Sequence, residues 1–370
     1  MSKILFISNL YPPLHVGGYE IIAYQIANGL KTYDKNVQIL TSNYSKTGLR
    51  GENEVIRKLK ILPFRSHKEN LARKIASYYI WIYNFIYTLF IIKKMDPDLI
   101  VIWSLRNISI SPLYSSRLSQ KPIVLCLHSY WFLPEIRFAQ KQKIKNVIFN
   151  SIIVKQRYND AGFQPQNFDV IYNGIELNKI KRRRDNKIKK MLYVGRLSPE
   201  KGLETLIAAF SLLDFKKYPD LILSIAGSGD PAYTSFLQSK IKPQLKERIK
   251  FLGNVDHNQI WDVYDSHDLL IVPSIWTEPF GLIIIEAMAR GTITLASNSG
   301  GPKEIINDGQ NGFLVETGRP DLMKLKIESI LNNPRLRKII RENAYQTISS
   351  KFLLSSTIDK YNQFFTNTIG

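Results

Sequence analysis

The chain has 370 residues, of which 44% are hydrophobic and 11% aromatic, and its formal net charge at pH 7 is +20. That length is large for one hydrophobic core and suits two domains of about 180 residues each. A single cysteine, Cys126, excludes an intramolecular disulfide and fits a reducing compartment. The first residues, MSKILFISNLYPP, lack the pattern of a secretory signal, so we expect a cytoplasmic protein whose first strand begins at once.

The positive charge is concentrated in the first half of the sequence. Residues 1–190 contain 31 Lys and Arg against 12 Asp and Glu, whereas residues 191–370 contain 20 against 19. Such asymmetry indicates an anionic partner for the first half: a phospholipid surface, a nucleic acid or an anionic small substrate. A lysine-rich bias of the source proteome is the alternative explanation, but that bias predicts an excess in both halves.

Short β-branched segments alternate with helical patterns along the chain. The strands predicted in the first half are Ile4–Ser8, Asn36–Thr41, Leu99–Trp103, Ile123–His128, Val147–Asn150 and Asp169–Tyr172. Those predicted in the second half are Met191–Val194, Leu221–Ala226, Ile249–Leu252, Leu269–Pro273 and Thr292–Ala296. This alternation predicts an α/β fold with two Rossmann-like, doubly wound domains whose parallel sheets are covered by helices on both faces.

The domain boundary is expected at NKIKRRRDNKIKK (178–190), which holds eight basic residues and one acidic residue. A segment so charged is expected to be a linker or surface loop. It would join an N-terminal domain, 1–177, to a C-terminal domain, 191–351. The last helical pattern, within 352–370, fits either an end to the second domain or a return to the first.

The segment SYYIWIYNFIYTLFII (77–92) is apolar and aromatic, with Arg73, Lys74, Lys93 and Lys94 flanking it. It is too short to be a transmembrane span, which needs about 20 apolar residues. We expect a buried core helix. The alternative is an interfacial helix that lies on lipid, with its aromatic rings at headgroup depth.

Two sequence features are suited to binding phosphate. NLYPPLHVGGYE places Gly17 and Gly18 between the first strand and a helix, where a bare backbone and helix N–H groups favour an anion. A tight turn explains these glycines equally well, and the GxGxxG pattern of NAD enzymes is missing. In LYVGRLSPEKG, Arg196 and Lys201 follow a strand of the second half, at the sheet edge where ligands bind. Each cation alone fits a solvated surface charge.

The stretch TEPFGLIIIEAMARG (277–291) holds Glu278 in a turn and Glu286 inside an apolar helix. Burying an unpaired carboxylate costs several kcal/mol or more, so Glu286 needs a partner or a ligand. One explanation is an ion pair with Arg290, four residues later. The other is a ligand: Glu286 lies roughly 7 Å along the axis from the helix start, which suits a ribose diol beside a phosphate bound there.

The order of these motifs along the chain resembles that of the retaining GT-B glycosyltransferases grouped as family 4. The motifs are Gly17–Gly18, His128 in LCLHSYWF, Arg196 with Lys201, and the pattern E-x7-E. The resemblance covers nearly the whole chain and is strongest over 190–316. Its matching stretches are VIYNGIEL (170–177), LYVGRLSPEKGLETLIAAF (192–210), FLGNV (251–255) and residues 273–316.

The resemblance implies a nucleotide-sugar donor bound in a cleft, mainly against the second domain. Arg196 and Lys201 would neutralise its diphosphate, aided by amides near Gly17 and Gly18. Glu278 would hydrogen-bond the donor sugar, and Glu286 would hold the ribose hydroxyls. The remaining expected contacts are His128 near the reacting sugar, Phe280, Gly281 and Leu282 as backbone contacts, and Gly253, Asn254 and Val255 near the base. Ser129 stands where many relatives have Asp, which leaves the acceptor contacts of that loop open.

The expected function is therefore retaining transfer from a UDP- or GDP-sugar to a hydroxyl acceptor, without cofactor or divalent metal, since fixed cations replace the ion. The expected acceptor is a lipid-linked glycan in cell-surface polysaccharide assembly, with the enzyme peripheral on the anionic inner membrane face. A soluble small-molecule or protein acceptor is the runner-up. A nucleotide-sugar epimerase and a non-catalytic membrane-binding protein are further alternatives. Nothing in the sequence matches a nucleic-acid-binding motif.

Overall fold

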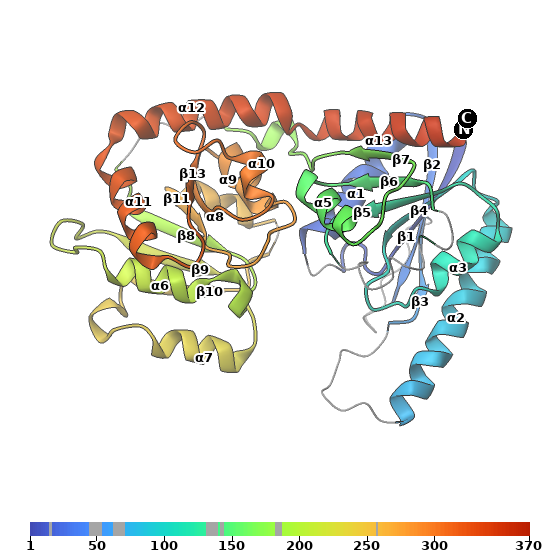
Figure 1. Cartoon of the computed structure of the whole chain (residues 1–370), viewed down its shortest axis with the longest axis horizontal. Helices are drawn as coiled ribbons and strands as arrows, with labels where there is room; N and C mark the ends of the chain where they lie inside the picture. Colours follow the sequence, from blue (N-terminus) through green and yellow to red (C-terminus); the bar gives the residue numbers. More distant parts are fainter. Residues whose placement is uncertain are drawn as a thin grey trace. The chain divides into compact units, whose positions relative to one another are not determined.

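The computed structural model contains two units, each built on its own parallel β-sheet (Figure 1). The first unit comprises Met1–Asn173 and Ser355–Gly370, and the second comprises Gly174–Leu354. The structure describes residues 1–14, 17–43, 54–61, 71–130, 140, 144–181, 187–256 and 258–370. The predicted α/β class with two doubly wound parallel sheets is confirmed.

The sheet of the first unit has the order β3-β2-β1-β4-β5-β6-β7, with every neighbouring pair parallel. Its strands are β1 (Ser2–Ser8), β2 (Lys35–Ser42), β3 (Val55–Leu59), β4 (Leu99–Ser104), β5 (Ile123–Leu127), β6 (Asn146–Phe149) and β7 (Asn167–Val170). Its helices are α1 (Gly18–Lys31), α2 (Leu71–Met95), α3 (Ser111–Leu118), α5 (Ile152–Asp160) and α13 (Leu354–Ile369).

Strand side chains alternate between the two faces of this sheet, so each face packs against different helices. On one face, Phe6 and Trp103 contact the rings of Phe365 and Tyr361, which belong to α13. The other face holds the core that the strands share with α2, α3 and α5. The C-terminal helix is therefore a structural part of the first unit (Figure 1).

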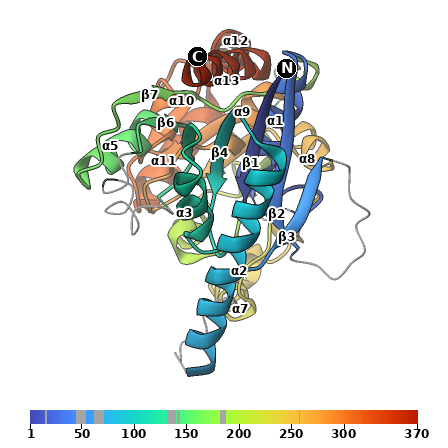
Figure 2. The same ribbon diagram turned by 90° about the vertical axis from the view of Figure 1, so that its right-hand side faces the viewer.

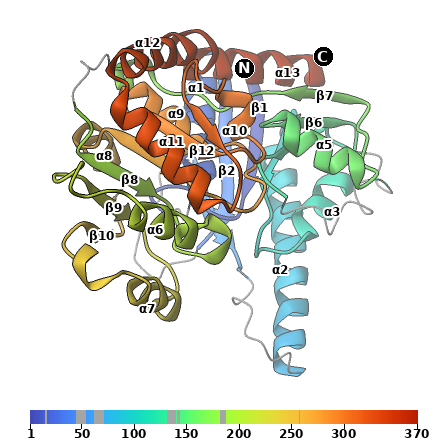
Figure 3. The same ribbon diagram turned by 60° about the vertical axis from the view of Figure 1, so that its left-hand side comes forward.

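The sheet of the second unit has the order β10-β9-β8-β11-β12-β13, again all parallel. Its strands are β8 (Lys190–Val194), β9 (Ile222–Ala226), β10 (Ile249–Gly253), β11 (Leu269–Val272), β12 (Ile293–Ser297) and β13 (Phe313–Val315). Its α-helices are α6 (Leu203–Ser211), α7 (Pro231–Ser239), α8 (Ile260–Ser266), α9 (Leu282–Ala289), α10 (Pro302–Ile305), α11 (Pro320–Asn332) and α12 (Pro334–Lys351). The main core joins the strands to α6 and α11 (Figure 3).

All eleven strands predicted from the sequence are present, with ends shifted by at most two residues. Strands β3 and β13 were not predicted, for two physical reasons. β3 reads VIRKL, and its two adjacent cations interrupt the apolar pattern. β13 has only three residues, fewer than a periodic pattern needs to be recognised.

The predicted boundary at 178–190 requires correction, because the chain enters the second unit at Gly174. Leu177–Lys179 form a short 3-10 helix, and the Lys181 ammonium lies 2.9 Å from a carboxylate oxygen of Asp265 in the second unit. Residues 182–186 of that segment lie outside the described residues. The first unit thus holds 24 Lys and Arg against 11 Asp and Glu, and the second 27 against 20. The basic segment 178–190 belongs to the second unit, so the charge difference between the units is smaller than that between the halves of the sequence.

The expectation of a buried core helix at 77–92 is wrong. α2 is long and apolar enough to span a membrane by length and composition, yet only 28% of its most apolar window is buried. Large apolar side chains stand exposed along it, among them Ile75, Tyr78 and Phe90. Figure 2 shows α2 continuing past the end of the sheet of the first unit.

The packing of α13 on α1 predicts an unusual response to a helix glycine. Alanine normally stabilises a helix interior over glycine by about 0.5–1 kcal/mol. A Cβ at Gly29 would lie 2.8 Å from Cγ1 and 2.9 Å from Cγ2 of Ile358, so rotating that stiff side chain cannot clear it. We expect Gly29→Ala to destabilise the first unit by about 1–3 kcal/mol in urea unfolding. In an Ile358→Ala background the same change should be neutral or stabilising, and an equal loss in both backgrounds would refute the packing argument.

Candidate active site

The carboxyl ends of β8 and β11 mark the place where a ligand is expected in the second unit. These two strands are neighbours in the sheet. From β8 the strand order continues through β9 and β10 on one side, and from β11 it continues through β12 and β13 on the other. Ligands of doubly wound sheets bind where the strand order reverses in this way. The loop after β8 carries Arg196 and Lys201, and the loop after β11 carries Glu278. Three predicted site residues therefore lie on the two loops at this point.

Lys201 and Glu278 are in direct contact between these loops. The Lys201 ammonium lies 2.6 Å from Oε1 of Glu278, and the Ser274 hydroxyl donates to the same oxygen at 2.5 Å. The ammonium also lies 5.0 Å from the centroid of the Trp276 ring. Both charged side chains are largely shielded from water. The structure thus brings together the predicted diphosphate cation and the predicted sugar-binding carboxylate.

Backbone contacts hold the two loops against each other. Gly202 has a φ of +70°, and a Cβ there would overlap the carbonyl oxygen of Pro273. The Ile275 amide donates to the carbonyl of Glu200 at 3.0 Å, and the Gly301 amide donates to the carbonyl of Glu278 at 2.8 Å. A residue other than glycine at position 202 would separate the loops, so the distance between Lys201 and Glu278 is fixed by the backbone.

The start of α9 supplies amide groups beside Glu278. Gly281 caps the helix with a φ of +111°, a conformation that favours glycine, and no side chain caps the first turn. Phe280 is buried and its ring contacts that of Phe352. Leu282 is partly exposed. An anion at this end of α9 would meet peptide N–H groups and the positive end of the helix dipole.

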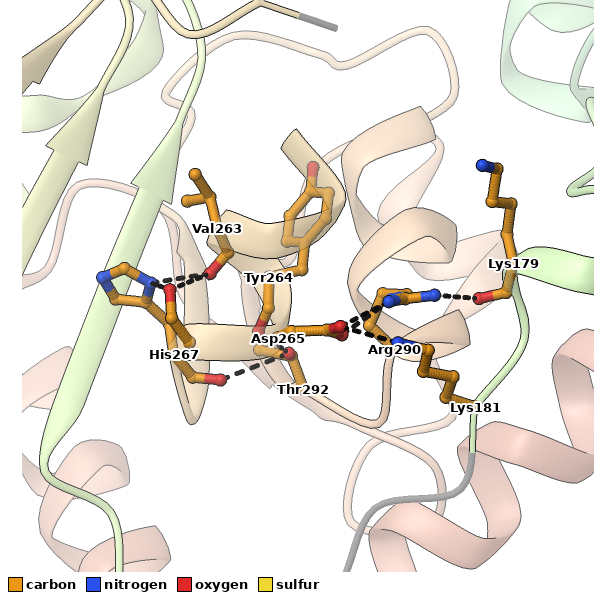
Figure 4. Close-up of polar contacts among 9 residues, drawn as sticks. Lys179, Lys181, Val263, Tyr264, Asp265, His267, Arg290 and Thr292 are labelled. Carbon is orange, nitrogen blue, oxygen red and sulfur yellow. Dashed lines mark hydrogen bonds and ion pairs between the residues drawn. The ribbon is translucent and has the colours of Figure 1, made fainter. Parts of the chain in front are cut away.

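Glu286 is buried in α9 and accepts a hydrogen bond of 2.8 Å from the Tyr264 hydroxyl. Burial raises the pKa of Glu286 to about 7, against the smaller, lowering effect of that hydrogen bond. The predicted alternative, an ion pair with Arg290, is wrong. Figure 4 shows the Arg290 guanidinium directed at Asp265, to whose Oδ1 its Nε donates at 2.7 Å, and at the Lys179 carbonyl. No salt bridge to Glu286 exists among the described residues, which leaves its carboxyl group available for a ligand.

Arg196 lies on the same loop as Lys201 but is solvent-exposed. Its side chain is 54% exposed, and its only close carboxylate among the described residues is Glu200, at 3.5 Å. An exposed pair at that distance contributes little to stability. The Tyr193 hydroxyl donates to the Arg196 carbonyl at 2.8 Å and so fixes the backbone rather than the guanidinium. Arg196 is therefore free to turn toward an anion.

Gly253 ends β10, the edge strand two places from β8, and Asn254 and Val255 follow it. The Gly227 amide donates to the Gly253 carbonyl at 2.7 Å, and the Gly195 amide donates to the Ala226 carbonyl at 3.0 Å. The loops after β8, β9 and β10 therefore lie side by side at one end of the sheet. This places the predicted base contacts at the same sheet edge as the predicted diphosphate contacts.

Gly17, Gly18 and His128 belong to the first unit. Both glycines were predicted to precede the helix, but Gly18 is the first residue of α1 and Gly17 is its N-cap. The Gly17 amide donates to Oε2 of Glu20 at 3.0 Å. This amide therefore already has an anionic acceptor in the structure. A phosphate at this turn would have to displace the buried Glu20 carboxylate or bind through Gly18 alone.

His128 follows β5 directly and is only 7% exposed. Its ring lies 4.2 Å from that of Trp103, and neither ring nitrogen has a hydrogen-bond partner among the described residues. Burial lowers the pKa of His128 to about 3. The imidazole is therefore neutral at physiological pH, so it can exchange hydrogen bonds with a ligand but carries no positive charge.

Three residues that support the site were not predicted. The Ser274 hydroxyl donates to Glu278, and the Tyr264 hydroxyl donates to Glu286. Trp103 contacts both the start of α1 and His128. The Trp103 indole N–H donates to the Tyr19 carbonyl at 3.0 Å, and its ring contacts His128. From the sequence, aromatic residues in buried elements are predicted to be ordinary members of the hydrophobic core. The available signal was that a buried indole N–H or phenol O–H must find a polar partner.

No group of three or more His, Cys, Asp or Glu side chains in the described part of the chain is arranged to hold a metal ion. The charged groups that the loops after β8 and β11 contribute to the predicted site are the Lys201 ammonium, the Arg196 guanidinium and the Lys201-bound carboxylate of Glu278. This set is suited to an anionic ligand.

The pKa of Glu286 predicts how the stability of the second unit depends on pH. Its value near 7 lies above the ordinary 4.5, so between these values the folded chain binds the proton more tightly than the unfolded chain. Stability should therefore fall as pH rises from 4.5 to 7, by about 3 kcal/mol in total. Urea unfolding of wild type and Glu286→Gln should show a difference that grows over this range and then levels off. Parallel curves for the two proteins would contradict the assignment.

Comparison with known families gives two matches that together cover residues 16–347. The family described as glycosyl transferases group 1 matches residues 175–347, and glycosyltransferase family 4 matches residues 16–179. The first match contains Arg196, Lys201, Glu278 and Glu286. The second contains His128.

Two curated relatives come from Methanocaldococcus jannaschii. The uncharacterized glycosyltransferase MJ1607 is 33% identical over 210 residues, which are 55% of this chain and 52% of that protein. The uncharacterized glycosyltransferase MJ1069 is 28% identical over 250 residues, 65% of this chain and 63% of that protein. The matched part of the chain thus spans less than two thirds of the length of either relative.

Solved structures match over nearly the full length. Anabaena Alr3699/HepE, crystallised in complex with UDP and glucose, is 23% identical with a TM-score of 0.78, and the match covers 99% of this chain and 100% of that one. Sucrose-phosphate synthase from Thermosynechococcus elongatus is 20% identical with a TM-score of 0.81, covering 99% of each chain. At this identity the likeness shows the fold. The chain therefore has the GT-B fold and belongs to the glycosyl transferases of group 1, with a family 4 N-terminal part.

Proposed function

We propose that this protein is a retaining glycosyltransferase that moves a sugar from a UDP- or GDP-sugar to a hydroxyl group of a lipid-linked or glycan acceptor. The observation that carries the proposal is the contact between Lys201 and Glu278, 2.6 Å long, at the point where the strand order of the second sheet reverses. One partner of this pair suits a diphosphate and the other suits sugar hydroxyls. The relative from Anabaena, in complex with UDP and glucose, supports a donor of this class.

Cleavage of the bond between sugar and diphosphate leaves negative charge on the diphosphate. Lys201 and Arg196 carry permanent positive charge on one loop, and the uncapped amides at the start of α9 lie on the next. Charges and dipoles that are already in place stabilise such a transition state without reorganising. These groups take the role that a divalent ion has elsewhere, so we propose that transfer needs no metal.

The two glutamates suit different parts of the donor. Glu278 is bound to a cation, so it stays an acceptor and can take a hydrogen bond from a sugar hydroxyl. Glu286 lies deeper, about five residues into α9, and ribose hydroxyls would donate to its carboxylate. The proposed role of neutral His128, a hydrogen bond with the reacting sugar, is taken from the family resemblance. Retention of configuration is proposed from the family resemblance, as is a role in cell-surface polysaccharide assembly on the inner membrane face.

Removing the Lys201 charge should weaken nucleotide binding. A charge-assisted hydrogen bond contributes about 1.5–3 kcal/mol, so Lys201→Met should raise the dissociation constant for the nucleoside diphosphate about 10- to 100-fold in calorimetry. Lys338→Met, at an exposed lysine of α12, is the matched control and should bind as wild type does. Glu286→Ala should weaken binding as well. Unchanged affinity in both Lys201→Met and Glu286→Ala would remove the site assignment.

The function itself is tested by a donor screen that measures nucleotide release from UDP-, GDP- and ADP-sugars. One or two donors should give release above the buffer rate, and EDTA should leave that rate unchanged. Magnetic resonance of the product would establish the configuration at the anomeric carbon. Release with none of the donors, in a protein that also fails to bind any nucleotide, would overturn the proposal.

A further inference from the structure

A line of large apolar side chains runs along the outer face of α2. Ile75, Tyr79, Ile86 and Phe90 are 61%, 55%, 59% and 54% exposed. At 100° per residue, these four positions fall within about 60° of one another around the helix axis. Lys93, also exposed, has the same direction as Ile75. We call these five residues the α2 stripe.

The opposite face of α2 is fixed to the first unit, so the helix cannot roll to bury the stripe. Asn84 accepts a hydrogen bond from the Lys60 amide at 2.8 Å and donates to the Ile108 carbonyl at 2.6 Å. Ile91 and Ile92 lie in the core shared with the strands. Turning the helix would break these hydrogen bonds in a buried place, at a cost of about 1–3 kcal/mol for each unsatisfied group.

The charged residues of α2 itself all have one sign. α2 contains no Asp or Glu, and Lys74, Lys93 and Lys94 stand exposed at its two ends. The Lys60 ammonium lies 4.4 Å from the ring centroids of both Tyr79 and Tyr83. The first acidic residue after the helix, Asp96, is in an ion pair with Lys121. An apolar line with cations at both ends and along one side is complementary to an anionic, partly apolar surface.

We propose that the α2 stripe is a docking surface for an anionic phospholipid membrane, on which α2 lies parallel to the surface. From Ile75 to Lys93 the stripe is about 27 Å long. Its isoleucines and phenylalanine would enter the acyl boundary, while the tyrosine hydroxyls and lysine ammonium groups would remain among the headgroups. Because the other face of α2 packs on the sheet, the folded unit presents the helix to the membrane and does not insert it as a span.

A second copy of this chain fits the stripe less well. Pairing two α2 helices in parallel would place Lys74 against Lys74, and antiparallel pairing would place Lys74 against Lys93 and Lys94. No acidic residue on the helix could neutralise these contacts. Like charges facing each other in this way destabilise a helix pair, whereas anionic headgroups are attracted to each exposed lysine by about 1 kcal/mol.

The inference rests on the proposed function for its purpose, since docking would bring the enzyme to a lipid-linked acceptor. The test is flotation of the full chain with vesicles of phosphatidylcholine alone or of an equimolar mixture with phosphatidylglycerol. Wild type should float with the anionic vesicles, and the double variant Ile86→Glu, Phe90→Glu should lose at least about tenfold in partitioning, since two buried apolar side chains are lost. The control, Leu212→Glu with Ile339→Glu at exposed sites of the second unit, should float as wild type does.

Several outcomes would overturn the inference. They are equal recovery of wild type with neutral and anionic vesicles, no recovery with either, and unchanged flotation of the double variant. A dimer seen by light scattering in wild type and lost in the double variant would assign the stripe to a second copy instead. Nucleotide binding and the melting temperature are measured on the same samples. Flotation without nucleotide binding would overturn the proposed function alone, and nucleotide binding without flotation would overturn the docking surface alone.

Discussion

The contact between the Lys201 ammonium and the Glu278 carboxylate organises the candidate site. It joins the loops after β8 and β11, the two strands between which the order of the second sheet reverses. A largely buried cation and carboxylate stabilise each other only at close range, so this pair requires the loop backbones to approach closely. Gly202 allows that approach, and the Gly301 amide holds the Glu278 carbonyl from the other side. The proposed donor would thus bind to a pair of charges whose positions are set before it arrives.

Glu278 and Glu286 show how one residue type acquires two environments in the same segment. Glu278 lies in the turn before α9, where a cation and the Ser274 hydroxyl satisfy it. Glu286 lies inside α9, where the Tyr264 hydroxyl is the one hydrogen-bond donor to its side chain among the described residues, and burial raises its pKa to about 7. Arg290 could have neutralised Glu286 but is already held by Asp265. A buried carboxyl group left without a cation costs stability, which is understandable if hydroxyl donors of a ligand complete its hydrogen bonding.

Much of this arrangement could be predicted from the sequence, because parallel strands place the residues that follow them at one edge. Arg196, Lys201 and Glu278 were recognised as site candidates from that rule and from the family resemblance. The partners of these residues could not be predicted in the same way. Whether Glu286 pairs with Arg290 or Tyr264 depends on tertiary packing of α8 against α9, and the bond from the Gly17 amide to Glu20 depends on local turn geometry. Spacing along the chain leaves both questions open.

The helices α2 and α9 show the limit of composition as a guide. Both are rich in apolar residues and both were expected to be buried, yet α9 lies in the interior and α2 presents a line of apolar side chains to solvent. Composition reports how much apolar surface a helix has, whereas the number of neighbours is set by its position in the fold. α9 lies against β11 and β12, with α8, α10 and α12 around it, whereas the main partners of α2 in the described part of the chain are α3 and β3. An apolar face that the fold leaves uncovered on a lysine-flanked helix is best explained by something outside the chain, and for α2 the surrounding charge is suited to lipid headgroups.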